Sequence, residues 1–344
     1  MKTLLLAILL CAGCAGNSVQ DASVQDASIG AGIDSGAGHW RAGPPLPVPR
    51  FEAYAAAARG KLWFIGGITG TFGDQQSARE SDRVDVLDPD SGLWSQGPAL
   101  PDGGPKHHLA VATIGDSIYV LGGFTGILGG ADPAGKFLPN AQTFVLEDAG
   151  WRRLADQPVP RGAATAQAID GIIYVAGGGD DDVKERSDLY AYDPVADRWS
   201  VRAPMPTGRE HLASCALDHH MLVLGGWFSI AMQTVTAAQI YDPALDRWTI
   251  APDMPTSRGG FGAATLGDRC FAIGGEAWHD ALPGTLHAND SYGAADGWVD
   301  FAPMPTARHG LGVTALGGVI WTVGGGPVRG NSYTDVVEIF DPGL

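Results

Sequence analysis

The sequence has few charged residues, no block of lysine or arginine, and no long apolar run beyond its N-terminus. Only 17% of its 344 residues are charged, and the formal net charge is −16. Such a diffuse negative field repels phosphate backbones and anionic headgroups. We therefore expect no nucleic-acid partner, and no binding of the folded part to a membrane surface.

Cysteine is equally scarce, with four residues in the whole chain. Cys11 and Cys14 belong to the N-terminal leader, which leaves Cys215 and Cys270 in the folded part. The latter two lie in apolar runs and look like buried packing residues, although two cysteines also allow one disulfide. No disulfide framework is needed in a chain with this much apolar sequence.

Residues 1–13 have the pattern of an export signal, with one lysine before a short apolar core. The segment Cys11-Ala-Gly-Cys14 resembles a bacterial lipoprotein box, which usually has leucine where Cys11 stands. This resemblance implies lipidation of Cys14 and an exported protein of the bacterial cell envelope. Such an outer-membrane lipoprotein, facing the periplasm or the surface, touches the membrane through its lipid anchor only. A plain signal peptide cleaved nearby is the alternative.

Residues 14–38 form the second predicted part, a low-complexity linker. The segment is poor in aromatic and basic residues, and Ser18–Ala22 is repeated at once as Ser23–Ala27. It cannot bury enough apolar surface to offset the entropy of ordering. We expect a flexible tether between the lipidated cysteine and a folded domain at 39–344.

Glycine is abundant, with 50 residues, and pairs of glycines recur about every 50 positions. Each pair ends an apolar run typical of a β-strand; the pairs begin at Gly66, Gly122, Gly177, Gly225, Gly274 and Gly324. A cation always stands sixteen residues before the pair: Arg50, Lys106, Arg161, Arg209, Arg258 and Arg308. This constant spacing predicts a two-stranded hairpin with one type of turn.

A tryptophan precedes each cation by ten residues, or by twelve in the case of Trp94 and Lys106. A Pro-rich link separates the two, and a third strand ends in Asp-Pro in four of the six repeats. These features resemble the Kelch repeat, a four-stranded antiparallel blade. The second and fifth repeats lack Asp-Pro, so the pattern defines their third strands less well.

The resemblance implies an all-β fold, a six-bladed Kelch propeller spanning residues 39–344. The last repeat has its cation, its glycine pair and Asp341-Pro342 but no tryptophan after them. Trp40 precedes the first complete repeat. We expect an N-terminal strand around Trp40 to complete the last blade and close the ring, which removes unpaired edges.

The loops after the second strands are long and varied, and in this fold they share a face with the cations. We predict ligand binding there by a ring of cations with neighbouring imidazoles: Arg50, Lys106, His107, Arg161, Arg209, His211, Arg258, Arg308 and His309. Guanidinium groups bind carboxylates in bidentate fashion, so an acidic glycan fits such a mouth. The alternative is that each cation bonds backbone carbonyls or an acidic loop residue.

Catalytic and metal patterns are weak by comparison. Glu210 and His211 form the best acid/base pair, although such a histidine is more often a binding contact. The run Asp180–Asp182 lacks the spacing of a calcium loop, and His279, Asp280 and His287 lack a known ligand spacing. We predict no metal site and no cofactor.

We therefore expect a surface-tethered, monomeric binding module for a protein or an acidic glycan. Secreted Kelch propellers also include copper galactose oxidases and six-bladed sialic-acid mutarotases. The oxidase ligands do not map onto this chain, whereas the second group implies an alternative, a carbohydrate mutarotase or epimerase that uses an Arg/His-lined central mouth. A structural role in an envelope complex is a third interpretation.

Overall fold

A computed structural model describes residues 38–71, 73–127, 136–180, 184–228, 231, 233–278 and 284–344. All described strands lie in the compact unit Ser35–Leu344. The predicted signal, the lipidation site Cys14 and most of the predicted linker lie outside the described residues. The same holds for Asp181, Asp182, His279 and Asp280. Within the described ranges, no helix has the length and apolar character needed to cross a bilayer.

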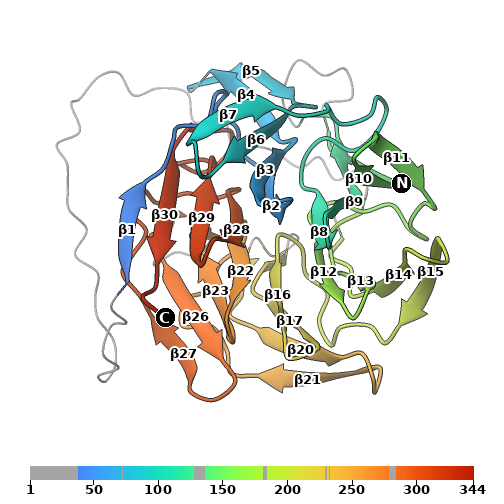
Figure 1. Cartoon of the computed structure of the whole chain (residues 1–344). Helices are drawn as coiled ribbons and strands as arrows, with labels where there is room; N and C mark the ends of the chain where they lie inside the picture. The colour runs from blue at the N-terminus through green and yellow to red at the C-terminus, as the bar shows by residue number, and fades with distance from the viewer. Residues whose placement is uncertain are drawn as a thin grey trace, which may run out of the picture. The chain divides into compact units, whose positions relative to one another are not determined.

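Six four-stranded antiparallel sheets surround a common axis, with one strand of each sheet innermost (Figure 1). Blade one contains β2 (Tyr54–Ala58), β3 (Lys61–Ile65), β6 (Val84–Asp88) and β7 (Leu93–Gln96). Blade two contains β8 (Ala110–Ile114), β9 (Ser117–Thr125), β10 (Leu138–Glu147) and β11 (Gly150–Leu154). Blade three contains β12 (Thr165–Ile169), β13 (Ile172–Ala176), β14 (Leu189–Asp193) and β15 (Arg198–Arg202).

Blade four contains β16 (Ala213–Leu217), β17 (His220–Leu224), β20 (Ala238–Asp242) and β21 (Arg247–Ala251). Blade five contains β22 (Gly262–Leu266), β23 (Arg269–Ile273), β26 (Asn289–Gly293) and β27 (Gly297–Asp300). Blade six contains β28 (Gly312–Leu316), β29 (Val319–Val323), β30 (Val337–Asp341) and, from the other end of the chain, β1 (His39–Ala42). The predicted six-bladed propeller is confirmed.

Ring closure follows the sequence-based prediction. β1 pairs antiparallel with β30, and Trp40 stands opposite Phe340 in the register. The third strands that lacked Asp-Pro, β10 and β26, are also present and paired on both sides. An Asp-Pro turn is therefore not required for a third strand in this chain.

Three of the expected loops contain short hairpins. β4 (Ile68–Thr71) pairs with β5 (Asp74–Glu80), β18 (Trp227–Phe228) with β19 (Gln233–Thr234), and β24 (Glu276–Ala277) with β25 (Gly284–Thr285). Each hairpin follows a glycine pair, on the face where the sequence predicted binding. They give this face a more ordered framework than simple loops.

The glycine pairs join neighbouring blades. The amide of Gly325 donates to the carbonyl oxygen of Arg50 at 2.8 Å, and the other five pairs make the same bond to the cation of the next blade. Gly324 has φ of +59°, and a Cβ there would lie 2.6 Å from that carbonyl oxygen. Only glycine fits where the backbone is left-handed and its neighbour this close.

The tryptophans make a second repeated contact. Each indole nitrogen donates to a carbonyl in the link at the end of the preceding blade, as Trp248 does to Ala203 at 2.8 Å and Trp298 to Pro252 at 2.8 Å. The link that follows one tryptophan in the chain therefore accepts the hydrogen bond of the next tryptophan. The aromatic ring packs on its own blade while its polar atom bonds the preceding one.

The apolar core lies between neighbouring blades. One cluster, for example, packs Trp63 and Val84 of blade one against Ile118 and Val120 of blade two. Cys215 and Cys270 are fully buried, as expected, and they are also bonded to each other across blades four and five. The disulfide corrects the interpretation of these cysteines as packing residues alone.

Candidate functional site

The five repeat arginines are fully buried, and their guanidinium groups point into their own blades. Arg308 donates to the carbonyl of Gly324 at 2.6 Å and to Glu338 on the third strand at 2.7 Å. The other arginines bond equivalent groups: Arg50 pairs with Asp85, Arg161 with Gly177 and Asp188, Arg209 with Gly225 and Gln239, and Arg258 with Ala272 and Asp290.

The sixth cation, Lys106, also turns away from the axis. Its ammonium group donates to the carbonyl oxygens of Leu100 and Pro101 at 3.3 and 2.8 Å. A side chain with no exposed surface cannot contact a ligand from solvent. The structure therefore corrects the prediction of a positive ring. Five of its members are fully buried: Arg50, Arg161, Arg209, Arg258 and Arg308. Lys106 is partly buried with its ammonium group bonded to two carbonyls, so the alternative of bonds to carbonyls and acidic residues holds.

The axis is occupied by the residue two positions after each cation. These six residues all have positive φ, between 49° and 61°: Glu52, His108, Ala163, His211, Gly260 and Gly310. Each amide donates to the carbonyl of the same position in a neighbouring blade, at 2.7 to 3.2 Å. The bonds run from Glu52 to Gly310, Gly260, His211, Ala163, His108 and back to Glu52, so that they form a closed ring of six. We call these residues the axial ring.

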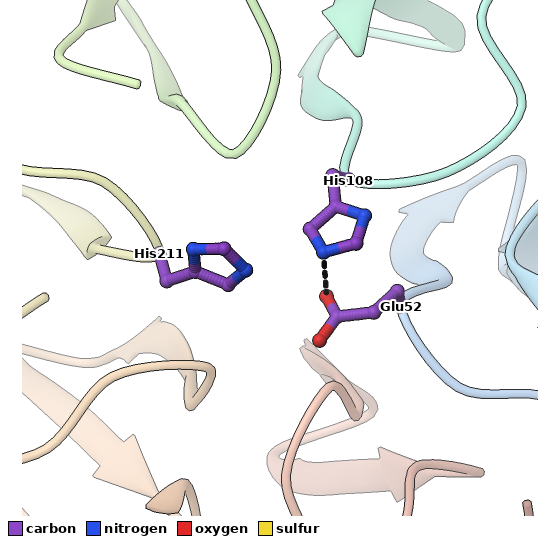
Figure 2. Close-up of side chains that lie close together, drawn as sticks. All are labelled: Glu52, His108 and His211. Atoms are coloured by element: carbon purple, nitrogen blue, oxygen red, sulfur yellow. Dashed lines mark ion pairs between the residues drawn. The ribbon is translucent and has the colours of Figure 1, made fainter. Parts of the chain in front are cut away.

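Half of the axial ring carries ionisable side chains, and the other half carries alanine or glycine. Figure 2 shows Glu52, His108 and His211 converging from three blades. Their ligand-type atoms lie within 4.8 Å of one another, and His108 Nε2 is 3.5 Å from Glu52 Oε2. Below the ring, a central cavity of about 570 Å³ is lined by all six innermost strands, mostly with small residues.

On the loop side, aromatic and polar side chains surround the axial ring. His211 stacks on Trp227 with ring centroids 4.4 Å apart, and Trp227 lies 5.3 Å from Trp278. The guanidinium of Arg329 lies 3.6 Å above the Trp278 ring and 4.0 Å from Glu276. Together Trp227, Trp278, Glu276, His309 and Arg329 form what we call the loop-face cluster.

Several buried polar atoms in or beside this cluster have no hydrogen-bond partner among the described residues: Trp227 Nε1, Trp278 Nε1, His309 Nδ1 and the Tyr333 hydroxyl. Buried polar atoms in folded proteins are nearly always bonded to protein or ordered water. Most of the buried repeat arginines, Thr143, Gln157 and Asn289 also have such atoms, so the candidate site is marked instead by the aromatic and charged side chains that gather beside the axial ring.

The protonation of the site is set mainly by burial and by three glutamates. Burial raises the pKa of Glu52 to about 7, against the attraction of His211. Burial disfavours protonated His211, but the hydrogen bond and charge of Glu210, with Glu52 and Glu276, outweigh this effect and raise its pKa to about 9. Burial lowers the pKa of His107 to about 4 and that of His108 well below its usual value.

The structure thus brings together three of the predicted site residues, His107, His211 and His309, with the predicted catalytic candidate Glu210. Sequence reasoning missed Glu52, Glu276, Trp227, Trp278 and Arg329, and did not assign a role to His108. A usable signal existed for Glu52 and His108, since both stand two positions after a repeat cation. Trp227 and Trp278 lie in the loops that follow glycine pairs. The lengths of these loops differ between blades, so the repeat spacing does not align the two residues.

Comparison with known proteins agrees with this architecture. A family model described as the KLHDC2/KLHL20/DRC7 Kelch-repeats domain matches residues 100–275, just over half of the chain. Kelch-like protein terF of Aspergillus terreus is 25% identical over 193 residues, which cover 55% of this chain and 41% of that protein. Kelch-like protein 35 of Mus musculus is 28% identical over 155 residues, which cover 45% of this chain and 23% of that protein.

The chain therefore spans less than half the length of these relatives. Among solved structures, that of YjhT superimposes with a TM-score of 0.70 at 16% identity. The match covers 86% of this chain and 95% of that one. At this level of identity, the likeness concerns the fold.

Proposed function

The chain belongs to the Kelch-repeat family of β-propellers, and on that premise we propose that it is a binding module that holds a protein or glycan ligand at its loop face. The observation that carries the proposal is the group of aromatic and charged side chains, Trp227, Trp278 and Arg329, that lies beside the axial ring on the loop face. These three side chains are at least partly exposed, and such groups on the loops of a rigid scaffold are typical of a ligand-binding face.

The side chains of the loop-face cluster favour a hydroxyl-rich ligand over a strongly anionic one. Trp227 and Trp278 stay partly exposed beside His211 and Arg329, and a sugar ring would pack on this remaining indole surface. The buried repeat arginines no longer support a preference for an acidic glycan. The basic groups left at the site are Arg329 at the rim and His211, and Glu276 lies beside the first of them.

Binding of glycan arrays, followed by calorimetry with the best hit, tests this proposal. Trp278→Ala removes one donor and one stacking surface, and we expect at least a tenfold loss of affinity, equivalent to about 1.4 kcal/mol. His219→Ala, in an exposed turn on the opposite face, is the control and is expected to leave affinity unchanged. Ligand binding that survives Trp278→Ala and Trp227→Ala places the ligand elsewhere.

We also propose export and attachment through Cys14, on the strength of the N-terminal sequence pattern. A lipidated Cys14 and a tether through residue 38 would hold the propeller clear of the membrane. The mass of the mature N-terminal peptide and the partitioning of Cys14→Ala into membranes test this attachment. A Cys14→Ala protein that still partitions with membranes contradicts it.

A sugar-active enzyme of the mutarotase type is a second candidate, favoured by one observation. Glu210 Oε1 lies 3.6 Å from His211 Nδ1 at the axis, and Glu52 has a pKa of about 7, so acid and base groups coexist there near neutral pH. Exchange of sugar anomers followed by NMR tests this candidate. No acceleration over buffer by the wild-type protein removes it, whereas acceleration that Glu52→Gln abolishes supports it.

A further inference from the structure

The axial ring brings two imidazoles and one carboxylate together from three different blades. Glu52, His108 and His211 are separated by whole repeats, and the sequence feature they share is their position two residues after a repeat cation. Their ligand-type atoms nevertheless lie within 4.8 Å of one another in a largely buried setting. We propose that Glu52, His108 and His211 bind one divalent transition-metal ion of the zinc class at the propeller axis, independently of a ligand at the loop-face cluster.

The spacing of the first pair already suits a shared ion. Two ligand atoms bound to one tetrahedral zinc ion at about 2.1 Å stand about 3.4 Å apart. His108 Nε2 and Glu52 Oε2 are 3.5 Å apart. A ligand atom of His211 lies within 4.8 Å of ligand atoms of the other two residues, and metal binding would draw the His211 ring closer to complete the set.

Hydrogen bonding orients His108 for metal binding. His107 Nε2 lies 2.8 Å from the carbonyl oxygen of Gly126, which only accepts, so this nitrogen carries a hydrogen. In neutral His107, Nδ1 then accepts from His108 Nδ1 at 2.6 Å. The proton of His108 therefore sits on Nδ1, and the lone pair of Nε2 faces Glu52. Metal-binding histidines are typically held by such an outer hydrogen bond.

His211 is positioned by ring stacking and by the charge of a nearby carboxylate, without a hydrogen bond of normal length. Its ring lies nearly parallel to that of Trp227, at an interplanar angle of 10°, and its Nδ1 faces Glu210 Oε1 at 3.6 Å. The other ring nitrogen points towards Glu52 and His108 (Figure 2). A carboxylate on the outer nitrogen and a metal on the inner one is the common arrangement around bound zinc.

The remaining half of the axial ring leaves room for a further ligand to the ion. Ala163, Gly260 and Gly310 present only small groups towards the axis. Three protein ligands with an open position are typical of zinc sites that bind water or substrate. Two nitrogens and one carboxylate suit zinc or a similar transition metal, whereas calcium and magnesium prefer oxygen ligands throughout.

Titration of the metal-free full chain with Co²⁺ tests the proposal directly. Leader thiols are competing ligands, so the experiment uses the Cys11→Ser/Cys14→Ser background. We expect one equivalent of Co²⁺, a visible absorption spectrum of a low-symmetry four- or five-coordinate ion, and its loss on addition of Zn²⁺. A wild-type chain that takes up no stoichiometric Co²⁺ or Zn²⁺ overturns the proposal, whatever the variants do.

Substitutions then locate the site. Glu52→Gln, His108→Asn and His211→Asn should each lower affinity more than about 100-fold, since even outer-shell changes cost 10–100-fold. His107→Ala, which removes the partner of His108 Nδ1, should fall within that smaller range. His219→Asn is the matched control and should bind normally. Unchanged binding in all three ligand variants refutes the assignment, and circular dichroism establishes that each variant is folded.

Discussion

The indole nitrogen of Trp40, in the outer strand of blade six, donates a 2.7 Å hydrogen bond to the carbonyl oxygen of Ala302, in the link after blade five. The same ring lies 4.9 Å from Phe340, its partner in the β1–β30 register. One residue of the first strand thus bonds blade five while it packs on blade six. Ring closure depends on this residue as well as on the β1 hydrogen bonds.

Trp40→Ala should lower the free energy of unfolding by about 3 kcal/mol, the low end for such truncations, because the side chain is half-buried. Trp40→Phe keeps an aromatic ring against Phe340 and should lose only about 1 kcal/mol with the hydrogen bond. Urea denaturation followed by far-UV circular dichroism measures both. Equal losses in the two variants would show that the hydrogen bond dominates.

Gly324→Ala should destabilise the propeller far more than Gly317→Ala. Both residues have similar positive φ, +59° and +66°, so each substitution carries the left-handed penalty of about 1–2 kcal/mol. A Cβ at Gly324 also meets the carbonyl oxygen of Arg50 at 2.6 Å, whereas one at Gly317 meets nothing within 4 Å. We expect a further loss of at least about 2 kcal/mol in the first variant. Thermal unfolding of the pair measures the difference.

Arg308→Met should cost about 3–5 kcal/mol of stability, because it leaves the buried carboxylate of Glu338 without its partner. The double variant Arg308→Met/Glu338→Leu removes both charges and should recover much of the loss. Chemical denaturation of the three proteins gives the coupling. If Arg308→Met keeps full stability but loses ligand binding, the arginine belongs to the binding site after all.

Stability should fall as pH rises through the titration of Asp300. This carboxyl stands opposite Asp290 across β26 and β27, and burial together with that neighbour raises its pKa to about 6. The folded state therefore binds the proton more tightly than the unfolded chain, and the resulting stabilisation is complete below about pH 4 and is lost by about pH 6. Asp300→Asn should flatten this slope and raise the urea midpoint near neutral pH. Parallel pH profiles for the two proteins would contradict the assignment.

The blade architecture was predictable because its determinants are local and repeated. A cation, a glycine pair and a tryptophan recur at nearly constant spacing, since the same hairpin and the same contacts between blades recur six times. The role of Trp40 was predictable because the last repeat has no tryptophan of its own. The third strands of blades two and five form without Asp-Pro. β10 buries the apolar run Phe144–Leu146, whereas β26 buries mainly polar residues, among them Asn289 and Asp290.

The direction of the arginines was not predictable from spacing. Arg50 pairs with Asp85 and Arg308 with Glu338, and the acid comes from a third strand that follows a loop of variable length. No constant separation therefore connects cation and acid in the sequence. The disulfide could not be predicted with certainty either, because Cys215 and Cys270 stand on a first and a second strand of adjacent blades and have no repeated spacing.

The six hydrogen bonds of the axial ring join main-chain atoms, so the ring itself does not depend on the side chains at its six positions. The requirement at each position is tolerance of a left-handed backbone, which histidine, asparagine and aspartate meet better than most residues. A Cβ at Gly260 would meet nothing nearer than 3.7 Å, whereas one at Gly310 would lie 2.7 Å from Glu52 Oε1. Gly260 is thus a place where new chemistry can be engineered or can evolve by a single substitution, on a scaffold that presents one residue per blade to a common centre.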